Sequence, residues 1–236
     1  MNISLENKVA VVTGASRGIG RAIAAALAKA GASVAICGRT QADVTKTVAD
    51  LSSKGRIVGR SVDVTNVDEV SRFFGYVDEQ FGGLDILVNN AGIGIFRSVA
   101  ELSMEEWKSV LDTNLNGVFY CSHEAVNRMR KRGGGAIVNI SSLAGKNPFA
   151  GGAAYNASKF ALNGFSEAMM LDHRNDNIRV SYIMPGSVDT GFNPNWAAGA
   201  WKIAPEDIAE VVLTVLGMPE RTLISRIEMR PLKPPK

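Results

Sequence analysis

Short runs of β-branched and other apolar residues alternate along the chain with longer segments of helical periodicity. This alternation restricts the fold most, because strands that alternate with helices predict βαβ units and a parallel sheet covered on both faces. The runs expected as strands are Lys8–Thr13, Ser33–Cys37, Arg56–Val62, Leu84–Val88, Ala136–Ser141, Arg179–Met184 and Leu223–Met229. The segments expected as helices are Ile19–Ala30, Gln41–Ser53, Val67–Gln80, Glu105–Val110, Leu115–Arg130, Ala153–Asn175 and Pro205–Leu216.

Right-handed crossovers between such units favour a doubly wound α/β fold of the Rossmann type. We therefore expect a seven-stranded, mostly parallel sheet with helices on both faces. No segment is long enough to act as a linker, so residues 1–236 are expected to form a single domain.

Residues 187–203 interrupt the alternation with glycines, asparagines and the tryptophans Trp196 and Trp201. An irregular loop of this length inside a domain is usually functional, so we expect a substrate lid. The alternative is a surface excursion whose tryptophans cover apolar surface. Phe192 and the two tryptophans would give a lid an apolar inner wall, which favours a hydrophobic or aryl ketone as substrate.

Composition excludes several classes of function. The 26 Lys and Arg against 23 Asp and Glu leave a formal charge of only +3 on 236 residues, which predicts neither a nucleic-acid nor a membrane partner. Two cysteines, Cys37 and Cys121, rule out a disulfide framework and favour a reducing cytoplasm. We see no signal peptide and no apolar run long enough to span a membrane. His123 and His173 stand alone, so no metal site is expected.

A glycine-rich segment follows the first expected strand and opens the first expected helix. Gly14, Gly18 and Gly20 there would let the backbone turn tightly, approach a phosphate and pack against the sheet. The helix N-terminus would present free N–H groups and the positive end of its dipole to a pyrophosphate. The spacing departs from G-x-G-x-x-G, and an ordinary strand-to-helix turn is the alternative, but the position favours a dinucleotide site.

The end of the second expected strand indicates which dinucleotide would bind. NAD-preferring sites usually have an acidic residue there, whereas this chain has Gly38 followed by Arg39. Arg17, inside the glycine loop, can reach the same region. Two guanidinium groups without a carboxylate suit a 2′-phosphate, which predicts NADP(H). The alternative is that both arginines are solvated surface residues.

Three residues with catalytic chemistry are expected to meet at the carboxyl edge of the sheet. Tyr155 and Lys159 are four residues apart on an expected helix and so share one face. Ser142 lies at the end of the fifth expected strand. Each residue type is common in structural roles, but a phenol, an ammonium and a hydroxyl together at this edge predict an active site.

With these segments in place, the sequence resembles the short-chain dehydrogenase/reductase family over nearly its whole length, weakest after Gly186. The matching motifs are Thr13-Gly-x-x-x-Gly-Ile-Gly20, Asp63-Val64, Asn89-Asn-Ala-Gly92, Asn114, Ser142, Tyr155-Asn-Ala-Ser-Lys159 and Pro185-Gly186. The resemblance implies hydride transfer between the nicotinamide and a carbonyl or alcohol carbon.

The resemblance also implies roles for the catalytic residues. Tyr155 would be the acid in reduction and the base in oxidation, with Lys159 favouring the phenolate and binding the nicotinamide ribose. Ser142 would hold the substrate oxygen. Asn114 would position a water that links Lys159 to solvent.

The remaining family positions are implied cofactor contacts. Asp63 and Val64 would flank the adenine, and residues 90–92 would border the adenosine ribose, whereas Asn89 is expected to be structural. Pro185, Gly186 and Val188 would orient the carboxamide, with Thr190 near the carboxamide or the pyrophosphate. The full expected cofactor set is Gly14, Ser16, Arg17, Gly18, Ile19, Gly20, Arg39, Asp63, Val64, Asn90, Ala91, Gly92, Tyr155, Lys159, Pro185, Gly186, Val188 and Thr190.

The expected function is NADPH-dependent reduction of a ketone to a secondary alcohol, a 3-oxoacyl thioester being one possible substrate. The alternatives are a non-catalytic NADP-binding sensor or scaffold, and a hydroxy-acid dehydrogenase that works in the oxidative direction. Apolar residues on several faces of 115–130 and 153–175, Phe160 and Phe165 among them, predict a subunit interface, the alternative being packing against the sheet alone. The resemblance implies a homodimer or homotetramer through these helices.

Overall fold

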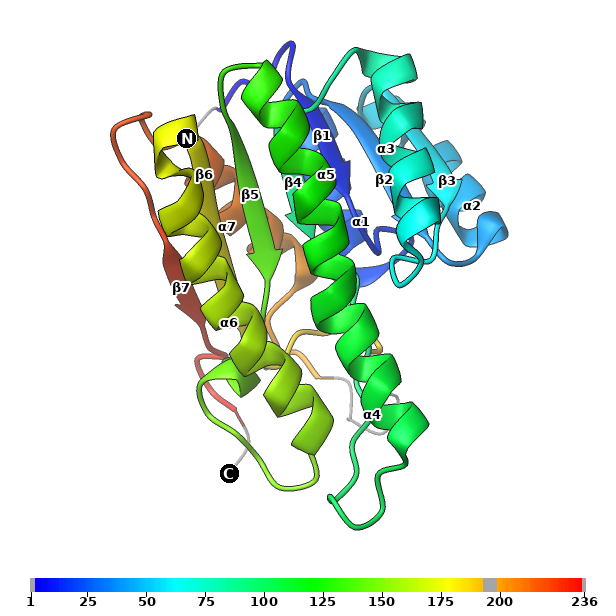
Figure 1. The fold of residues 1–236 in the computed structure, drawn as a ribbon, viewed down its shortest axis with the longest axis vertical. Coiled ribbons are helices and arrows are strands. Elements are labelled where there is room, and N and C mark those ends of the chain that lie inside the picture. Colours follow the sequence, from blue (N-terminus) through cyan, green and yellow to red (C-terminus); the bar gives the residue numbers. More distant parts are fainter. Residues whose placement is uncertain (1–2, 193–198, 235–236) are drawn as a thin grey trace.

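The computed structural model describes residues 3–192 and 199–234, and its framework is one sheet of seven strands (Figure 1). The strands are β1 (Val9–Val12), β2 (Ser33–Gly38), β3 (Ile57–Ser61), β4 (Ile86–Asn89), β5 (Gly135–Ile140), β6 (Ile178–Pro185) and β7 (Arg226–Met229). Their spatial order is β3-β2-β1-β4-β5-β6-β7, and every neighbouring pair is parallel. The doubly wound α/β fold is confirmed, and its sheet is wholly parallel.

Helices cover both faces of the sheet (Figure 1). Apolar side chains of α1, α2 and α7 belong to the cluster on one face, and those of α3, α5 and α6 belong to the cluster on the other. The helix bounds are α1 (Gly18–Lys29), α2 (Gln41–Leu51), α3 (Val67–Phe81), α4 (Met104–Leu111), α5 (Gly117–Lys131), α6 (Ala153–His173) and α7 (Pro205–Leu216).

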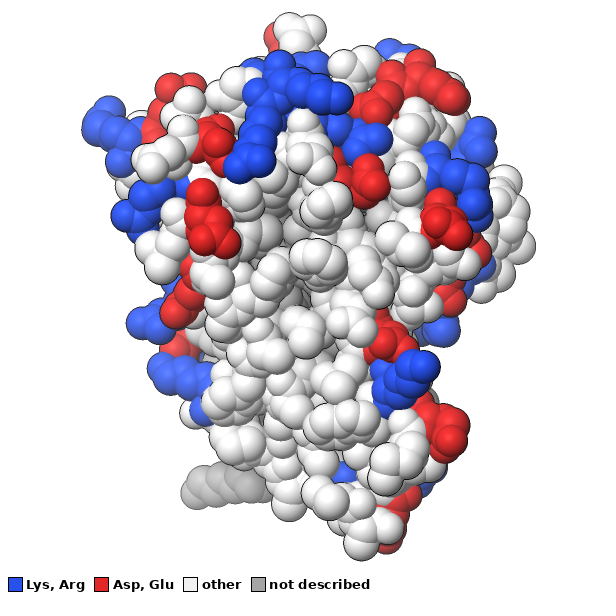
Figure 2. Space-filling view, viewed as in Figure 1, with Lys and Arg blue, Asp and Glu red and all other residues white. Residues whose placement is uncertain are grey.

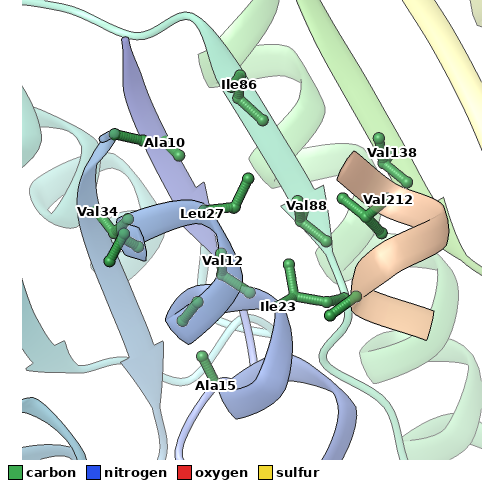
Figure 3. Close-up of a cluster of buried hydrophobic side chains, with 14 of the residues drawn as sticks. Ala10, Val12, Ala15, Ile23, Leu27, Val34, Ile86, Val88, Val138 and Val212 are labelled. Atoms are coloured by element: carbon green, nitrogen blue, oxygen red, sulfur yellow. The ribbon is translucent and has the colours of Figure 1, made fainter. Parts of the chain in front are cut away.

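The core on the α1 side forms where α1 and α7 lie side by side against the central strands. Ile23 and Leu27 of α1 and Val212 of α7 are fully buried there (Figure 3). They pack against β1, β4 and β5, whose residues on this face are β-branched or small. This packing fixes the start of α1 relative to the ends of β1 and β4.

The segment between α4 and α5 differs from the sequence prediction. Residues 111–114 were expected to separate two helices, but a π-helical turn, Asp112–Asn116, joins α4 to α5 without a break. A π turn inserts one extra residue into the helical repeat and so shifts the spacing of the apolar residues. The shifted spacing makes one continuous helix resemble two helices separated by a short loop. Such turns occur frequently at functional sites.

A chain of buried polar side chains crosses the middle of the sheet. Asn89 of β4 donates to Ser122 Oγ of α5 at 3.1 Å and to Asn139 Oδ1 of β5 at 2.9 Å. Asn139 donates to Ser166 Oγ of α6 at 2.8 Å, and Ser166 donates to the carbonyl of Leu162 at 2.7 Å. Asn89 is therefore structural, as expected, and the chain of hydrogen bonds fixes α5 and α6 relative to the sheet.

The last strand and the expected lid region differ in detail from the prediction. Strand β7 begins at Arg226, because residues 223–225 do not follow strand geometry. Within the described parts of 187–203, Val188 and Ile203 form an isolated parallel β-bridge, which brings the two ends of this segment together. Trp196 lies outside the described residues. Among residues 3–192 and 199–234 there is no helix with the length and hydropathy needed to cross a membrane.

Candidate active site

A cleft of about 720 Å³ opens at the carboxyl ends of the strands. Strands β1 and β4 are neighbours here although α1–α3 separate them in sequence, which is the switch point where doubly wound sheets bind ligands. Segments from Gly14 to Pro234 line the cleft.

The glycine loop forms one wall of the cleft, and two of its glycines lie too close to neighbouring atoms to be replaced by a residue with a side chain. Gly14 has φ of +62°, and a Cβ there would lie 2.7 Å from Ala91 Cα. A Cβ on Gly20 would lie 2.6 Å from the carbonyl oxygen of Gly14. These close approaches let the loop after β1 pack directly against the loop after β4. Gly18, at the start of α1, lines the cleft, whereas Gly20 is behind the wall.

The N-terminus of α1 faces this cleft without a side-chain cap. Arg17 occupies the N-cap position with no capping hydrogen bond, and the first turn holds no acidic residue. The first N–H groups of a helix lack intrahelical partners and carry the positive end of the helix dipole. The site therefore suits an anionic group such as a pyrophosphate.

Asn90 and Ala91 hold the two loops together. The side chain of Asn90 donates to the carbonyl oxygens of Thr13 and Gly14 at 3.0 Å. The main-chain N–H groups of Asn90 and Ala91 both donate to Thr13 Oγ1 at 3.0 Å. Both residues line the cleft, but these bonds also make them the support of the glycine loop.

Arg17 and Arg39 are exposed at the edge of the cleft beside Gly38. Neither guanidinium forms an ion pair with any residue in the described part of the chain. Asp43, in the first turn of α2, lines the same edge and was not singled out from the sequence. An acidic residue in the first turn after an N-cap, here Thr40, is common in any helix, so the sequence did not identify Asp43 as a cleft residue.

Tyr155 and Lys159 lie on adjacent turns of α6 at the bottom of the cleft. Lys159 is 5% exposed, and its Nζ donates to the carbonyl of Ile140 at 3.0 Å. Burial disfavours the ammonium and lowers the pKa of Lys159 from 10.5 to about 8. Its Nζ lies 5.8 Å from the centre of the Tyr155 ring.

The environment of Tyr155 favours the protonated form of its phenol. Tyr155 is partly buried and lines the cleft, and burial of the phenol raises the pKa of Tyr155 above its usual 10. The hydroxyl of Ser142 acts against the rise by hydrogen bonding to the phenol. Ser142 Oγ also accepts from the N–H of Ala144 at 3.1 Å, which fixes the serine at the end of β5.

Asn114 is fully buried in the π-helical turn and does not line the cleft. Its Oδ1 accepts from the N–H of Ile93 at 2.8 Å, and its Nδ2 donates to the carbonyl of Ile93 and to Ser158 Oγ. Ser158 in turn donates to the carbonyl of Tyr155 at 2.8 Å. Both amide hydrogens of Asn114 are thus used to tie the loop after β4 to α6.

The other expected cofactor residues surround the same cleft. Asp63 accepts from the N–H and the hydroxyl of Thr65, and with Val64 it lines the cleft after β3. Thr190 contacts the position of Gly18, because a Cβ on that glycine would lie 3.2 Å from Thr190 Cβ. The residues of the expected set that line the cleft are Gly14, Ser16, Arg17, Gly18, Ile19, Arg39, Asp63, Val64, Asn90, Ala91, Gly92, Tyr155, Lys159, Pro185, Gly186, Val188 and Thr190.

The wall beyond Tyr155 is aromatic. Phe192 and Trp201, both expected from the sequence, line it together with Phe96 and Phe149, which were not singled out. Phe96 and Phe149 come from loops without periodicity, and nothing in the sequence placed them near the tyrosine.

The two histidines lie elsewhere. His123 contacts the ring of Phe119 on α5, and His173 Nδ1 lies 2.9 Å from Asp176 Oδ2. Residues 3–192 and 199–234 contain no cluster of three potential metal ligands.

Comparisons with known proteins agree with this geometry. A family model described as short chain dehydrogenase matches residues 8–201. An uncharacterised oxidoreductase of Staphylococcus saprophyticus is 35% identical over 235 residues, which cover 98% of this chain and all of that protein. A 3β-hydroxysteroid dehydrogenase of Mediterraneibacter gnavus is 42% identical over 189 residues, 78% of this chain and 67% of that protein. A variant of actinorhodin polyketide ketoreductase solved with NADPH has a TM-score of 0.88 and 32% identity, covering 95% and 96% of the two chains.

Proposed function

The chain belongs to the short-chain dehydrogenase/reductase family of oxidoreductases, and from this premise we propose that it uses NADPH to reduce a ketone to a secondary alcohol. The observation that carries the proposal is the placing of Tyr155, Lys159 and Ser142 in the same cleft as the glycine loop. The NADPH-bound polyketide ketoreductase supports both the cofactor and the reaction. A 3-oxoacyl thioester is one ketone of this class.

The residues present fit a nicotinamide dinucleotide. The uncapped start of α1 would hold the pyrophosphate, and Gly18, which lines the cleft there, would let it approach the backbone. Arg17 and Arg39 would hold a 2′-phosphate. Lys159 would hold the nicotinamide ribose, and Pro185, Gly186 and Val188 would border the carboxamide. When bound, the reduced nicotinamide supplies the hydride that the carbonyl carbon receives.

The protein's own residues supply the proton and stabilise charge. As the carbonyl oxygen gains negative charge, the Ser142 hydroxyl would donate a hydrogen bond to it. Tyr155 would transfer its phenolic proton to the same oxygen, completing the alcohol. At neutral pH the raised pKa of Tyr155 keeps that proton available for transfer. The Lys159 ammonium would stabilise the phenolate that remains.

Asn114 would serve this reaction as a positioning residue. Its side chain joins Ile93, beside the cleft, to Ser158 and hence to the main chain of Tyr155. A water that links Lys159 to solvent would need a polar group other than the amide hydrogens of Asn114, since these are already used.

The direct test is the consumption of NADPH by the purified protein with a panel of ketones, followed by chiral analysis of the alcohols. We expect turnover of at least one ketone. Tight NADPH binding without turnover of any carbonyl would instead favour a non-catalytic NADP-binding sensor or scaffold.

A second candidate is oxidation of a secondary alcohol carried by a ring, which the similarity to a 3β-hydroxysteroid dehydrogenase favours. Oxidation requires the Tyr155 phenolate as base, and the raised pKa of the phenol makes that form scarce at neutral pH. If oxidation is the main activity, its rate with NADP⁺ and a cyclic alcohol will exceed ketone reduction when both are measured at pH 7.

Replacement of Arg17 or Arg39 by alanine is expected to raise the KM for NADPH by about 10- to 100-fold, because a charge-assisted hydrogen bond contributes about 1.5–3 kcal/mol. The KM for NADH, which has no 2′-phosphate, should change by less than threefold. Arg72→Ala is the matched control, since Arg72 is exposed on α3 and does not line the cleft. A wild-type protein that prefers NADH would contradict the assignment.

We also propose that the chain forms a homodimer or homotetramer through α5 and α6. Figure 2 shows an uncharged band over these helices, with charged side chains gathered toward the edges of the view. Phe119 on α5 and Phe160 on α6 are about half exposed, at 49% and 46%. Two copies could cover these rings against each other without bringing charges together.

Light scattering should therefore give the mass of two or four chains for the wild-type protein, and Phe119→Glu should reduce that mass. The control is Val67→Glu, because Val67 is exposed on α3. A wild-type monomer at micromolar concentration would refute the interface.

A further inference from the structure

Three phenylalanine rings lie on one side of the catalytic tyrosine, two of them against its ring, and form what we term the aromatic wall: Phe96, Phe149 and Phe192. The ring centre of Phe96 lies 5.5 Å from that of Tyr155 and 5.8 Å from that of Phe149. The ring centre of Phe192 lies 5.9 Å from that of Tyr155. All three rings line the cleft, and Phe149 and Phe192 keep about two fifths of their surface exposed.

The main chain is adapted to hold these rings. A Cβ on Gly94 would lie 2.7 Å from both the Phe96 and the Phe192 ring, and a Cβ on Gly152 would lie 2.7 Å from the Phe149 ring. Any side chain at either glycine would displace the wall. The wall therefore occupies space that only a residue without a side chain leaves open.

Hydrogen bonds also fix Phe149. Asn156, the residue after Tyr155 on α6, donates its side-chain N–H to the carbonyl of Phe149 at 2.9 Å. The N–H of Gly152 donates to the same carbonyl at 3.3 Å. Because Asn156 is buried on the helix that carries the tyrosine, the position of Phe149 is tied directly to the catalytic group.

Two cationic side chains besides Lys159 line the cleft on the C-terminal side of Tyr155 in the sequence, and one of them is paired. Arg230 pairs with Glu228, which also pairs with Lys146. Lys202 lies 6.0 Å from the ring centre of Trp201. The ring of Tyr155 itself is in contact with the rings of Phe96 and Phe192, whose carbons bind apolar groups and favour offset or edge contacts with another π-system.

From this arrangement we infer that Phe96 and Phe149 determine substrate specificity, selecting ketones that carry a flat aromatic ring close to the carbonyl. The inference rests on the proposed ketone reduction and adds to it the class of substrate. A planar ring would pack against the exposed edges or faces of the phenylalanines while its ketone oxygen reaches Tyr155. A saturated ring is thicker and lacks the π-system.

The test compares kcat/KM for phenylacetone and cyclohexylacetone, whose rings are separated from the carbonyl by one methylene so that their intrinsic reactivities are alike. We expect the wild-type protein to prefer phenylacetone by about tenfold, equivalent to about 1.4 kcal/mol. Phe96→Leu and Phe149→Leu keep apolar bulk but remove the ring. Each should lower the preference to threefold or less and change kcat/KM for cyclohexylacetone by less than threefold.

Phe81→Leu is the matched control, because Phe81 ends α3 and does not line the cleft, and it should keep the wild-type preference. NADPH binding and circular dichroism establish that each variant is folded; if a variant fails to fold, the wild-type ratio decides alone. Equal rates with both ketones in the wild type, or an unchanged ratio in both cleft variants, would overturn this specificity and leave the proposed reduction standing. Absence of turnover with every ketone would overturn the proposed function, and the specificity with it.

Discussion

Tyr155→Phe is expected to reduce kcat/KM for ketone reduction by about a thousandfold, because a positioned general acid contributes about 10²- to 10⁴-fold. The substitution removes only the hydroxyl, so the ring keeps its contacts with Phe96 and Phe192. NADPH affinity should change by less than about threefold, as the phenol is not a main anchor of the dinucleotide. Steady-state kinetics and NADPH fluorescence titration measure the two quantities.

The control for this substitution is Tyr76→Phe. Tyr76 lies on α3, where its ring contacts the Arg60 guanidinium at 4.0 Å, and it does not line the cleft. Removal of the Tyr76 hydroxyl should leave the rate of ketone reduction unchanged. Retained turnover in the Tyr155 variant would exclude the phenol as proton donor.

Lys159→Met should separate activity from stability. Turnover is expected to fall by about a hundredfold or more, because the ammonium that stabilises the phenolate is lost. The free energy of unfolding, by contrast, should rise relative to the wild type between pH 7 and 8, since a buried charge is replaced by an apolar chain of similar length. The lost hydrogen bond to the carbonyl of Ile140 offsets part of that gain.

The pH dependence identifies the cause of the stability difference. Below about pH 8, Lys159 is charged in both the folded and the unfolded state, and the folded state bears the full desolvation cost. Between about pH 8 and 10.5 the folded state loses this proton first, so wild-type stability rises relative to Lys159→Met by about 3 kcal/mol. Urea unfolding of both proteins across this range measures the difference, and a constant difference would contradict a lowered lysine pKa.

Other buried groups titrate in the same range but cancel in that comparison. Burial raises the pKa of Cys37 to about 12 and that of Cys121 well above 9. The unfolded state then loses these thiol protons first as pH rises above 9, so both proteins lose stability there. Because the cysteines are the same in the two proteins, their contributions cancel in the comparison.

Local sequence pattern was sufficient to predict the sheet and the position of the glycine loop at the end of β1. β-branched runs such as Val9–Val12 are buried on both faces, and their composition depends little on distant contacts. The glycines after β1 are needed where two loops touch, so their position after a strand was informative. Tyr155 and Lys159 were predictable as a pair because four residues make slightly more than one helical turn.

Features that depend on contacts between distant segments were not predictable. Phe96 meets Tyr155, and Phe149 meets Phe96, only through the tertiary packing of two irregular loops. The structural use of Asn114 depends on the π-helical turn and on Ile93, which lies 21 residues earlier. Sequence periodicity reads such a turn as a gap between helices, because the extra residue displaces the apolar pattern.

The order of the strands has a consequence for folding kinetics. Strands β1–β3 form one group of neighbours and β4–β7 form another. Within residues 3–192 and 199–234, the β1–β4 ladder, where Ala10 lies opposite Ile86, is the only strand pairing that joins the two groups. Pairing β1 with β4 closes a loop that contains the whole segment between Ala10 and Ile86, and closing so long a loop is entropically costly and slows folding. The glycine loop belongs to the first group and Tyr155 to the second, so a dinucleotide in the cleft would bridge this seam. Bound cofactor is thus expected to slow the separation of the two groups of strands. At a free cofactor concentration of about 100 times its Kd, the free energy of unfolding should rise by about 2.7 kcal/mol.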